Sequence, residues 1–408
     1  MAKWLISVNY KALDPIRLLA HVPTEFFVTG RIAGDARPAL CAGIHESATA
    51  FFQRRGGQAD RRFGWLSASA FHCRRGAATG DGAGRRYYSL GDINGLRRHL
   101  AEQNPAKART YLPRRDEARG EHLQVIAVTN FKGGSGKTTT SAHLAQHLAL
   151  AGYRVLAIDL DPQASLSALF GYQPELDLDG NDTLYAAIRY DDEGRPLGEV
   201  IRATYFDGLD IVPGNLELQE FEHTTPQMLA ARQGEGPMFF ARVQAALASV
   251  ADRYDVVVMD CPPQLGFLTL SALCAATSVL VTVHPQMLDV ASMSQFLFMT
   301  ADLLSVVREA GGELNFDFMR YLVTRYEPND GPQTQIVGFL RSLFGDRVLT
   351  APLVKSTAFS DAGLTKQTLY EVSCENFSRA TYDRAMESLT AVNGEIEGLI
   401  MKAWNRPV

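Results

Sequence analysis

Cysteine is scarce in this sequence, and the five cysteines present lie far apart. They are Cys41, Cys73, Cys261, Cys274 and Cys374, and no two of them form a CxxC pair among the 408 residues. Neither a disulfide framework nor a four-thiolate metal site is therefore supported. Reduced thiols in a cytoplasmic protein are the simplest interpretation.

Long apolar runs are also missing. No stretch of about 18 consecutive apolar residues occurs, so no transmembrane helix is predicted. Residues 1–23 contain a short apolar stretch, but Lys11, Asp14 and Pro15 interrupt it, which makes it a poor secretory signal. We expect a cytoplasmic protein that does not attach to a membrane.

The charge is unevenly distributed along the chain. The whole sequence carries 40 basic and 45 acidic residues, for a net charge of −5. Residues 1–120 hold 20 of the basic and 10 of the acidic residues, a net of +10, which leaves −15 for residues 121–408. Such asymmetry suggests that the basic part meets a polyanion. A hydrophobic content of 46% and a charged content of 21% exclude fibrous and fully disordered classes.

Short, nearly continuous apolar runs begin at residue 123 and alternate with segments of helix length. Such runs are typical of strands buried on both faces of a parallel sheet. A helix is predicted over residues 138–152, with Gly152 as its stop. The pattern predicts an α/β protein with a doubly wound, mostly parallel sheet over residues 121–408. The predicted strands cover residues 123–130, 154–161, 254–260, 278–284, 318–326 and 347–354.

A glycine-rich loop, FKGGSGKTTT, follows the first predicted strand at residues 131–140. Its glycines allow backbone N–H groups to surround a phosphate at the start of a helix. Lys137 would reach the β and γ phosphates, and the Thr138 hydroxyl would ligate Mg²⁺. The pattern GxxxxGK[ST] requires glycine at position 131, where this chain has Phe131, followed by an additional lysine, Lys132. The candidate nucleotide-binding residues are Lys132, Gly133, Gly134, Ser135, Gly136, Lys137, Thr138 and Thr139.

Three aspartates follow two of the other predicted strands. Asp159 and Asp161 end the run at 154–161, where the period of two sends both side chains to the same side. Asp260 ends the run at 254–260, a usual position for a carboxylate that holds Mg²⁺ through water. Capping a helix or forming a turn is the alternative role for each of them. Beside a phosphate loop, Asp260 and Asp159 are candidate metal-shell residues, and Asp161 is a candidate for positioning the attacking water.

Together, KGGSGKTTT, DLDPQASLS and DCPP resemble the deviant Walker A ATPases of the ParA and MinD group, above all the partition ATPases of repABC-type replicons. The resemblance covers about residues 85–408 and implies ATP and Mg²⁺ as cofactors. It implies that Lys132 reaches the phosphates of a partner subunit in an ATP-bound homodimer, as an arginine finger does elsewhere. It also implies that Thr139 contacts phosphate, Asp161 orients water and Asp260 is the Walker B carboxylate. Lys132, Lys137 and Asp161 are thus the candidate catalytic residues.

The same resemblance implies a plasmid partition function in the cytoplasm, associated with the nucleoid. ATP-bound dimers would bind DNA without sequence preference, and a RepB-like or ParB-like centromere-binding partner would stimulate hydrolysis. Because residues 121–408 are acidic overall, a DNA surface must be a local basic cluster. The candidates for it are Arg320, Arg325, Arg341, Arg347, Lys355 and Lys366.

Three other functions stay open. The MinD branch binds membranes through a carboxyl-terminal amphipathic helix; here the stripe formed by Leu389, Val392 and Ile396 has acidic flanks, which favours core packing. The nitrogenase iron protein needs two bridging cysteines per subunit, which Cys261 and Cys274 match poorly. A repressor that nucleotide switches without turnover is the non-enzymatic alternative, and autorepression can accompany partition.

The amino-terminal segment departs from the family. Residues 84–120 resemble the end of a winged helix-turn-helix module and a linker, with a basic strand leading into a helix capped at Ser89 or Asp92. Residues 1–83 have repeated arginine pairs and no sustained period of 3.6 or 2. Two explanations stay open: translation in the wrong frame or from a misassigned start, and a disordered basic arm that binds DNA.

Overall fold

A computed structural model describes residues 89–231, 237–312, 314–372 and 377–407 of the chain. Within this range, residues 89–113 form one unit and residues 114–407 another.

The smaller unit consists mainly of helix α2 (Leu90–Gln103), followed by η4 (Pro105–Lys107) and α3 (Ala108–Tyr111). Ser89 caps α2: its hydroxyl accepts a hydrogen bond from Asp92 N, and the Asp92 carboxylate accepts one from Ser89 N at 2.9 Å. This reciprocal capping box satisfies backbone donors at the helix start and confirms the predicted start at Ser89. The predicted basic strand before this helix and residues 1–83 lie outside the described residues, so the resemblance to a winged helix-turn-helix module stays a prediction.

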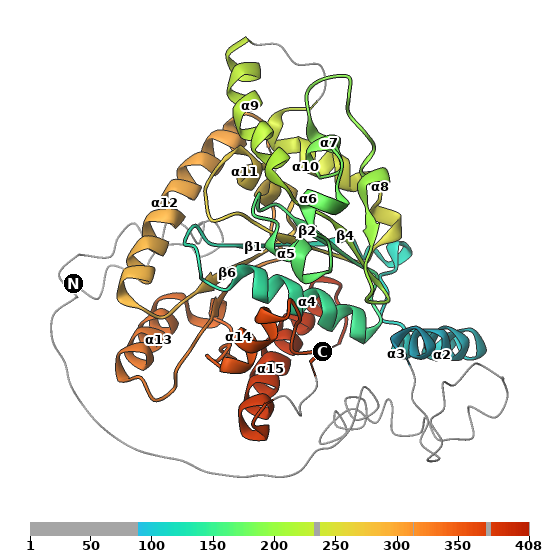
Figure 1. The fold of residues 1–408 in the computed structure, drawn as a ribbon, viewed down its shortest axis with the longest axis vertical. Coiled ribbons are helices and arrows are strands. Elements are labelled where there is room, and N and C mark those ends of the chain that lie inside the picture. The colour runs from blue at the N-terminus through green and yellow to red at the C-terminus, as the bar shows by residue number, and fades with distance from the viewer. Residues whose placement is uncertain (1–88, 232–236, 313, 373–376, 408) are drawn as a thin grey trace. The chain divides into compact units, whose positions relative to one another are not determined.

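The larger unit is built on a seven-stranded sheet with the order β3-β4-β2-β5-β1-β6-β7 (Figure 1). Every neighbouring pair is parallel except β3 with β4, which confirms the mostly parallel sheet predicted for this fold. The register places Asp159 beside Asp260, at the carboxyl ends of β2 and β5. The strands are β1 (Gln124–Thr129), β2 (Val155–Asp159), β3 (Arg202–Ala203), β4 (Leu209–Val212), β5 (Val256–Asp260), β6 (Ser278–Val283) and β7 (Phe318–Val323).

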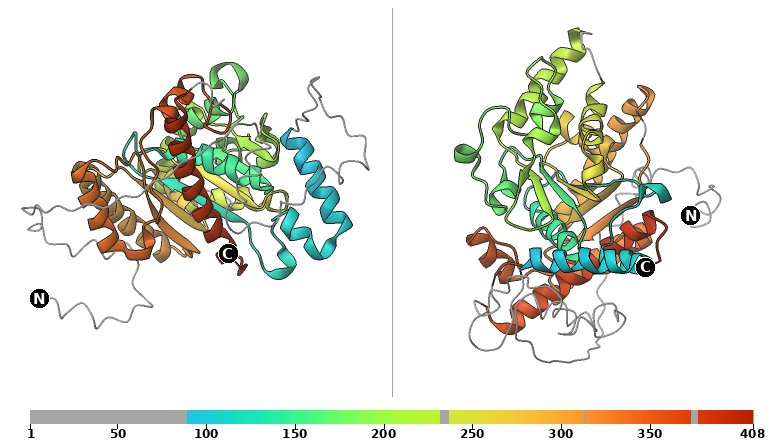
Figure 2. Two further views of the ribbon diagram at one scale, coloured as in Figure 1. Left: turned by 90° about the horizontal axis from the view of Figure 1, so that it is seen from below. Right: turned by 90° about the vertical axis from the view of Figure 1, so that its right-hand side faces the viewer.

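Helices cover both faces of the sheet, so the unit has three layers (Figures 1 and 2). Alternate residues of β1 point to opposite cores: Ile126 and Val128 to one, Val125 and Ala127 to the other. The first core is covered by α4 (Lys137–Ala151), α5 (Ser165–Leu169), α14 (Thr357–Leu364) and α15 (Arg379–Ala403). The second is covered by α7 (Tyr185–Ile188), α8 (Leu197–Val200), α9 (Gln219–Ala231), α10 (Phe239–Ala248), α11 (Phe267–Ala275), α12 (Met287–Glu309) and α13 (Gly331–Phe344). The remaining short elements are η5 (Glu117–Arg119), α6 (Pro174–Asp177), η6 (Leu216–Leu218), η7 (Ala251–Arg253) and η8 (Gly345–Arg347).

One strand prediction is wrong. Residues 347–354 follow the edge of β7 but make only isolated bridges, between Tyr321 and Val348 and between Tyr326 and Val354. Leu349 N and Leu353 N donate to Tyr321 O and Val323 O of β7, but the N–H of Ala351 between them donates to Glu395 on α15 at 3.1 Å, which interrupts the ladder. Strand β4 was not predicted, because its four residues are too short a run to show a period.

The carboxyl-terminal stripe packs in the core, as predicted. Leu389, Val392 and Ile396 on α15 are buried against the same core as α4. Helix α12 is the one helix in the described part of the chain that is long and apolar enough to cross a membrane, with a mean hydropathy of 1.5. Core helices of soluble proteins share this property, and Met293 and Phe296 of α12 are buried in the second core.

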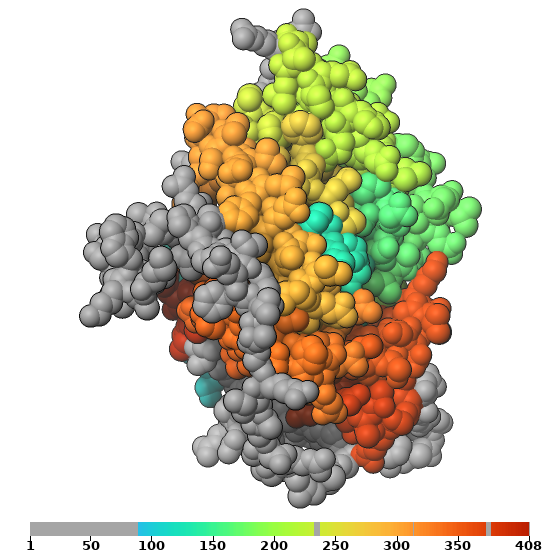
Figure 3. Space-filling view, turned by 90° about the vertical axis from the view of Figure 1, so that its left-hand side faces the viewer, coloured from blue at the N-terminus to red at the C-terminus, as the bar shows by residue number. Residues whose placement is uncertain are grey.

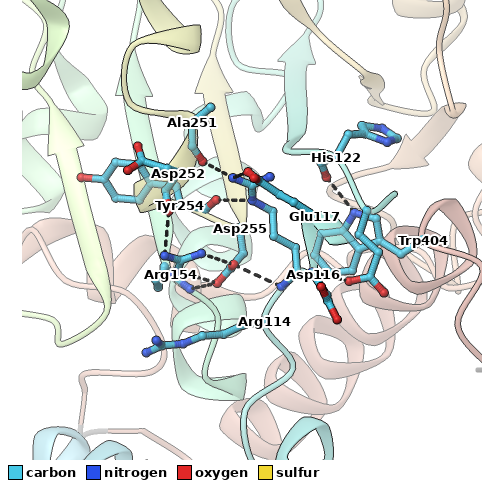
Figure 4. A network of polar contacts seen from close by, with 12 residues as sticks. Arg114, Asp116, Glu117, His122, Arg154, Ala251, Asp252, Tyr254, Asp255 and Trp404 are labelled. Carbon is cyan, nitrogen blue, oxygen red and sulfur yellow. Dashed lines mark hydrogen bonds and ion pairs between the residues drawn. The ribbon is translucent and has the colours of Figure 1, made fainter. Parts of the chain in front are cut away.

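At the amino ends of the strands, a dense polar network joins the start of this unit to β2 and β5 (Figure 4). Arg154 donates to both carboxylate oxygens of the fully buried Asp255, from Nη2 at 2.8 Å and from its backbone N at 2.8 Å. Arg115 N donates to the same carboxylate at 3.2 Å. The Trp404 indole donates to His122 O at 2.8 Å, which ties the end of the chain to the residues preceding β1.

Candidate functional site

The glycine-rich loop connects β1 to α4 at the carboxyl edge of the sheet. Gly134 (φ 76°) and Gly136 (φ 84°) have left-handed backbones, which only glycine adopts without strain. Two side chains that directly follow β7 hold the loop: Thr324 Oγ1 donates to Ser135 O at 2.7 Å, and Arg325 Nη1 donates to Gly134 O at 3.1 Å. The loop therefore keeps its shape through contacts beyond its own residues.

Lys137 is the first residue of α4 and is almost completely buried, with 7% of its surface exposed. Its ammonium group donates to Lys132 O at 3.3 Å, inside the curve of the loop. Burial lowers the pKa of this lysine, and the nearby Asp260 carboxylate opposes that shift. A buried cation lying under a backbone cradle is suited to bind an anion.

Asp260 ends β5 beneath this loop and is fully buried. Its Oδ1 accepts a hydrogen bond from Ser141 Oγ at 3.0 Å, and the Thr138 hydroxyl also bonds to the carboxylate. Its Oδ2 has no partner among the described residues. Burial, followed by the charge of Asp159, raises the pKa of Asp260 to about 7. An orphaned buried carboxylate oxygen next to a threonine hydroxyl fits a hydrated Mg²⁺, which favours few protein ligands and several waters.

Asp159 lies beside Asp260 but is already occupied. Its oxygens accept hydrogen bonds from Ser167 N (2.8 Å), Ser167 Oγ (2.7 Å) and Asp161 N (3.2 Å). Burial raises the pKa of Asp159 to about 6, although the Ser167 contacts oppose this. Strand β2 ends at Asp159, so the period-two argument does not extend to Asp161, which lies in the following turn. The contacts of Asp159 favour a role in positioning the Asp161 loop; its predicted metal role stays a prediction.

Asp161 is only partly buried, and its Oδ1 accepts a hydrogen bond from Gln163 N at 2.9 Å. No described group of three or more His, Cys, Asp or Glu side chains is arranged to hold a metal ion. A metal held by one threonine, one carboxylate and a bound phosphate is compatible with that finding.

The Lys132 side chain extends towards helix α12. Its ammonium forms an ion pair with Asp289, near the start of α12 in the same chain, and its backbone N donates to Asn130 Oδ1 at 3.1 Å. The sequence pattern predicted no site role for Asp289 or Ser141, and no role at the nucleotide loop for Thr324. A hydroxyl one turn after Lys137 was the available signal for Ser141, whereas nothing in the local sequence pattern marks the other two.

The six candidate DNA-binding residues are distributed over several elements. Arg320 lies on β7, Arg341 on α13 and Arg347 in η8, and Lys366 follows α14. Arg325 contacts the glycine-rich loop, and Lys355 forms an ion pair with Glu327 at 2.8 Å. The structure thus brings one of the six, Arg325, to the nucleotide loop and does not gather the set on one helix face.

The two cysteines that the structure describes are not bonded to each other. Cys261 is buried directly after Asp260, and Cys274 is half-buried on α11. Burial raises the pKa of both thiols. Raised thiol pKa values are typical of unreactive structural cysteines.

Comparison with known proteins identifies the family. A family model described as an AAA domain matches residues 123–309. A protein named "Putative replication protein A" from Rhizobium rhizogenes is 61% identical over 324 residues, which cover 79% of this chain and 80% of that protein. Protein SopA of Escherichia coli K12 is 33% identical over 285 residues, 69% of this chain and 72% of SopA. A solved structure titled "Partition Protein" has a TM-score of 0.56 at 18% identity, covers 80% of this chain and 84% of that one, and shows a shared fold. The chain therefore belongs to the ParA-type family of P-loop ATPases and is of the replication protein A kind.

Proposed function

We propose that this protein is a plasmid partition ATPase that binds ATP and Mg²⁺, dimerises on ATP and releases DNA after hydrolysis. The observation that carries the proposal is the arrangement around the loop at 132–139: buried Lys137 lies inside the loop, and the orphaned oxygen of Asp260 lies beneath it. The family relationship supports the partition function.

In this proposal the loop binds the phosphates of ATP through its backbone N–H groups and Lys137. Thr138 and Asp260 would hold Mg²⁺, which would neutralise phosphate charge. Thr139 would contact phosphate from the first turn of α4. The Asp159 carboxylate would fix the turn that carries Asp161, and Asp161 would orient the attacking water.

Lys132 completes the site from the partner subunit. In a dimer with two nucleotides at its interface, each Lys132 would extend to the phosphates bound by the other chain and stabilise the charge that develops during transfer. Hydrolysis would therefore depend on dimerisation. ATP would serve as a timer for the DNA-bound state, so the protein would reside on the nucleoid in the cytoplasm.

DNA binding would be non-specific and would be carried by the six basic residues between 320 and 366. Their side chains would contact phosphates, so affinity should fall with salt. A RepB-like or ParB-like centromere-binding protein would stimulate hydrolysis.

The test is ATP turnover with and without non-specific DNA and the cognate centromere-binding protein. We expect slow basal turnover and a clear increase when both are added. Lys137→Ala should lose nucleotide binding and turnover together, whereas Lys132→Ala should retain ATP binding and lose stimulated turnover by at least about 100-fold, the scale of a lost transition-state cation.

Controls separate this proposal from a nucleotide-switched repressor. Lys402→Ala, at the far end of α15, should leave both binding and turnover unchanged. If DNA and partner give no stimulation, and neither Lys132→Ala nor Lys137→Ala changes turnover, the partition proposal is wrong. ATP-dependent operator binding without turnover would favour the repressor.

A further inference from the structure

The head of the nucleotide loop is attached to helix α12 at two points. The ring of Phe131 stacks on that of Phe296, with centroids 6.0 Å apart and an angle of 5° between planes. The next residue, Lys132, forms its ion pair with Asp289 in the first turn of the same helix. Figure 3 shows the teal surface of this part of the chain next to the gold-to-orange surface that includes α12.

The carboxylate of Asp289 is unusual because it is nearly buried. It is 5% exposed, whereas Lys132 remains 42% exposed. Its Oδ2 lies 3.0 Å from His284 Nδ1, and its Oδ1 faces the Lys132 ammonium with no other partner among the described residues. A nearly buried carboxylate needs a cation or donors close by. The ammonium of Lys132 is that cation.

This arrangement conflicts with the role proposed for Lys132 in the dimer. One ammonium cannot pair with Asp289 of its own chain and at the same time reach the phosphates bound by a partner. We propose that Asp289 is a positioning residue that holds Lys132 in cis and thereby opposes assembly of the ATP-bound dimer. The inference rests on the proposed function, in which Lys132 acts in trans.

The symmetry of the dimer doubles the free-energy cost of breaking this ion pair. An ion pair with one exposed partner changes an equilibrium by about two- to fivefold. Each dimer must break two such pairs, one per chain, so the factors multiply. Removing the Asp289 charge should therefore tighten the dimer by about tenfold.

The experiment compares Asp289→Asn with the unaltered protein by sedimentation velocity, with Mg²⁺ and a slowly hydrolysed ATP analogue. Asparagine keeps the shape and the contact with His284 but removes the charge. We expect the dissociation constant of the dimer to fall about tenfold and the ATP concentration that gives half-maximal dimer to fall with it. Asp289→Glu, which keeps the charge, should restore the original value at least in part.

Asp302→Asn is the matched control, because Asp302 is an exposed carboxylate on the same helix. It should leave the dimer constant unchanged. Lys132→Ala combined with Asp289→Asn should behave as Lys132→Ala alone, since the contact has already been removed. A merely structural role of Asp289 would predict a further loss in the double variant.

Several outcomes would overturn the inference. If Asp289→Asn leaves the dimer constant unchanged or weakens the dimer, Asp289 does not oppose assembly. Failure of the proposed function looks different: the unaltered protein would form no ATP-dependent dimer at any concentration. If Asp289→Asn unfolds, Asp289→Ser and a shift in the dimer constant with salt provide the second measurement, because an ionic latch should open as salt rises.

Discussion

Two aspartates at opposite ends of one strand behave in opposite ways. Asp255 immediately precedes β5 and Asp260 ends it, and both are buried. Arg154 and Arg115 supply donors to both oxygens of Asp255, whereas Asp260 keeps one oxygen without a partner among the described residues. The amino edge of the sheet (Figure 4) is built for stability. The carboxyl edge retains a charged group without a full set of partners, which a ligand can supply. In such sheets ligands usually bind at the carboxyl edge, and binding sites are often built at a cost in stability.

Asp255→Asn should have the largest effect on stability. At this buried position, Arg154 would face a neutral amide instead of a carboxylate. The NH₂ group of the asparagine would also direct one hydrogen-bond donor at another. We expect a loss of about 3 to 4 kcal/mol in the free energy of unfolding, the range for breaking a buried pair. Urea unfolding followed by circular dichroism would measure it.

Its control is Asp252→Asn, three residues earlier, since only the backbone carbonyl of that residue accepts from Arg154. The control should change stability by less than about 0.5 kcal/mol. Equal losses in the two variants would contradict the contrast between the edges.

Asp260→Asn should instead raise the free energy of unfolding of the nucleotide-free protein. Burial raises the pKa of Asp260 to about 7 and that of Asp159 to about 6. The native state thus binds more protons than the unfolded chain between about pH 4 and pH 7, so the contribution of these groups is greatest at low pH and falls as pH rises through the folded pKa values. We expect the variant to match the unaltered protein near pH 5 and to be about 2 kcal/mol more stable at pH 8.

The measurement is urea unfolding of both proteins at pH 5, 6, 7 and 8. ATP with Mg²⁺ should reverse the order at pH 8, because only the carboxylate gains a ligand. A stability difference that does not change with pH would show that the Asp260 charge is not strained in the free protein.

The sequence predicted the parts of this edge that depend on local pattern. Buried parallel strands show as apolar runs, and the phosphate loop shows because glycine, lysine and threonine at fixed spacing have few other uses. The ion pair between Lys132 and Asp289 could not be predicted, since it joins residues 157 positions apart through the packing of α12. Residues 347–354 were predicted as a strand because a short apolar run is typical of one, whereas the bond from Ala351 N to Glu395 that breaks the ladder depends on the packing of α15.

Gly136→Ala should have a smaller effect that is also specific to the carboxyl edge. The three atoms nearest to the added Cβ would all belong to Thr324, the first at 3.5 Å, so space is not the difficulty. The strain comes from the φ of 84°, which costs alanine about 1 kcal/mol. We expect that loss in urea unfolding, together with weaker binding of a fluorescent ATP analogue.

The control is Gly394→Ala, in the interior of α15 with open space around its Cβ. That change should stabilise the protein by about 0.5 to 1 kcal/mol, because alanine favours helix. If both variants lose stability equally, the left-handed backbone of Gly136 is not the cause.

The smallest effect we predict is a pH dependence of dimerisation that arises at His284. Burial lowers the pKa of this histidine, and nearby cations lower it further. When Lys132 leaves Asp289, one of these cations goes and the carboxylate is left with His284 alone, so the pKa of His284 should rise. Opening then takes up protons, and lower pH should favour the dimer. The charged groups around His284 are Asp289 on α12, Lys132 in the nucleotide loop, Arg325 and Glu327 after β7, and Lys355.

Between pH 8 and pH 6 the dimer should therefore tighten by about two- to threefold more in the unaltered protein than in His284→Gln. The difference between the two proteins is the quantity to measure, because protonation of the nucleotide itself affects both equally. Sedimentation velocity with the same ATP analogue at pH 6, 7 and 8 provides it. Parallel pH profiles would mean that His284 takes up no proton when Lys132 leaves, so that Asp289 stays charged and unpaired. The free-energy cost of that unpaired carboxylate would then weaken the dimer by more than the small factor expected for breaking the ion pair.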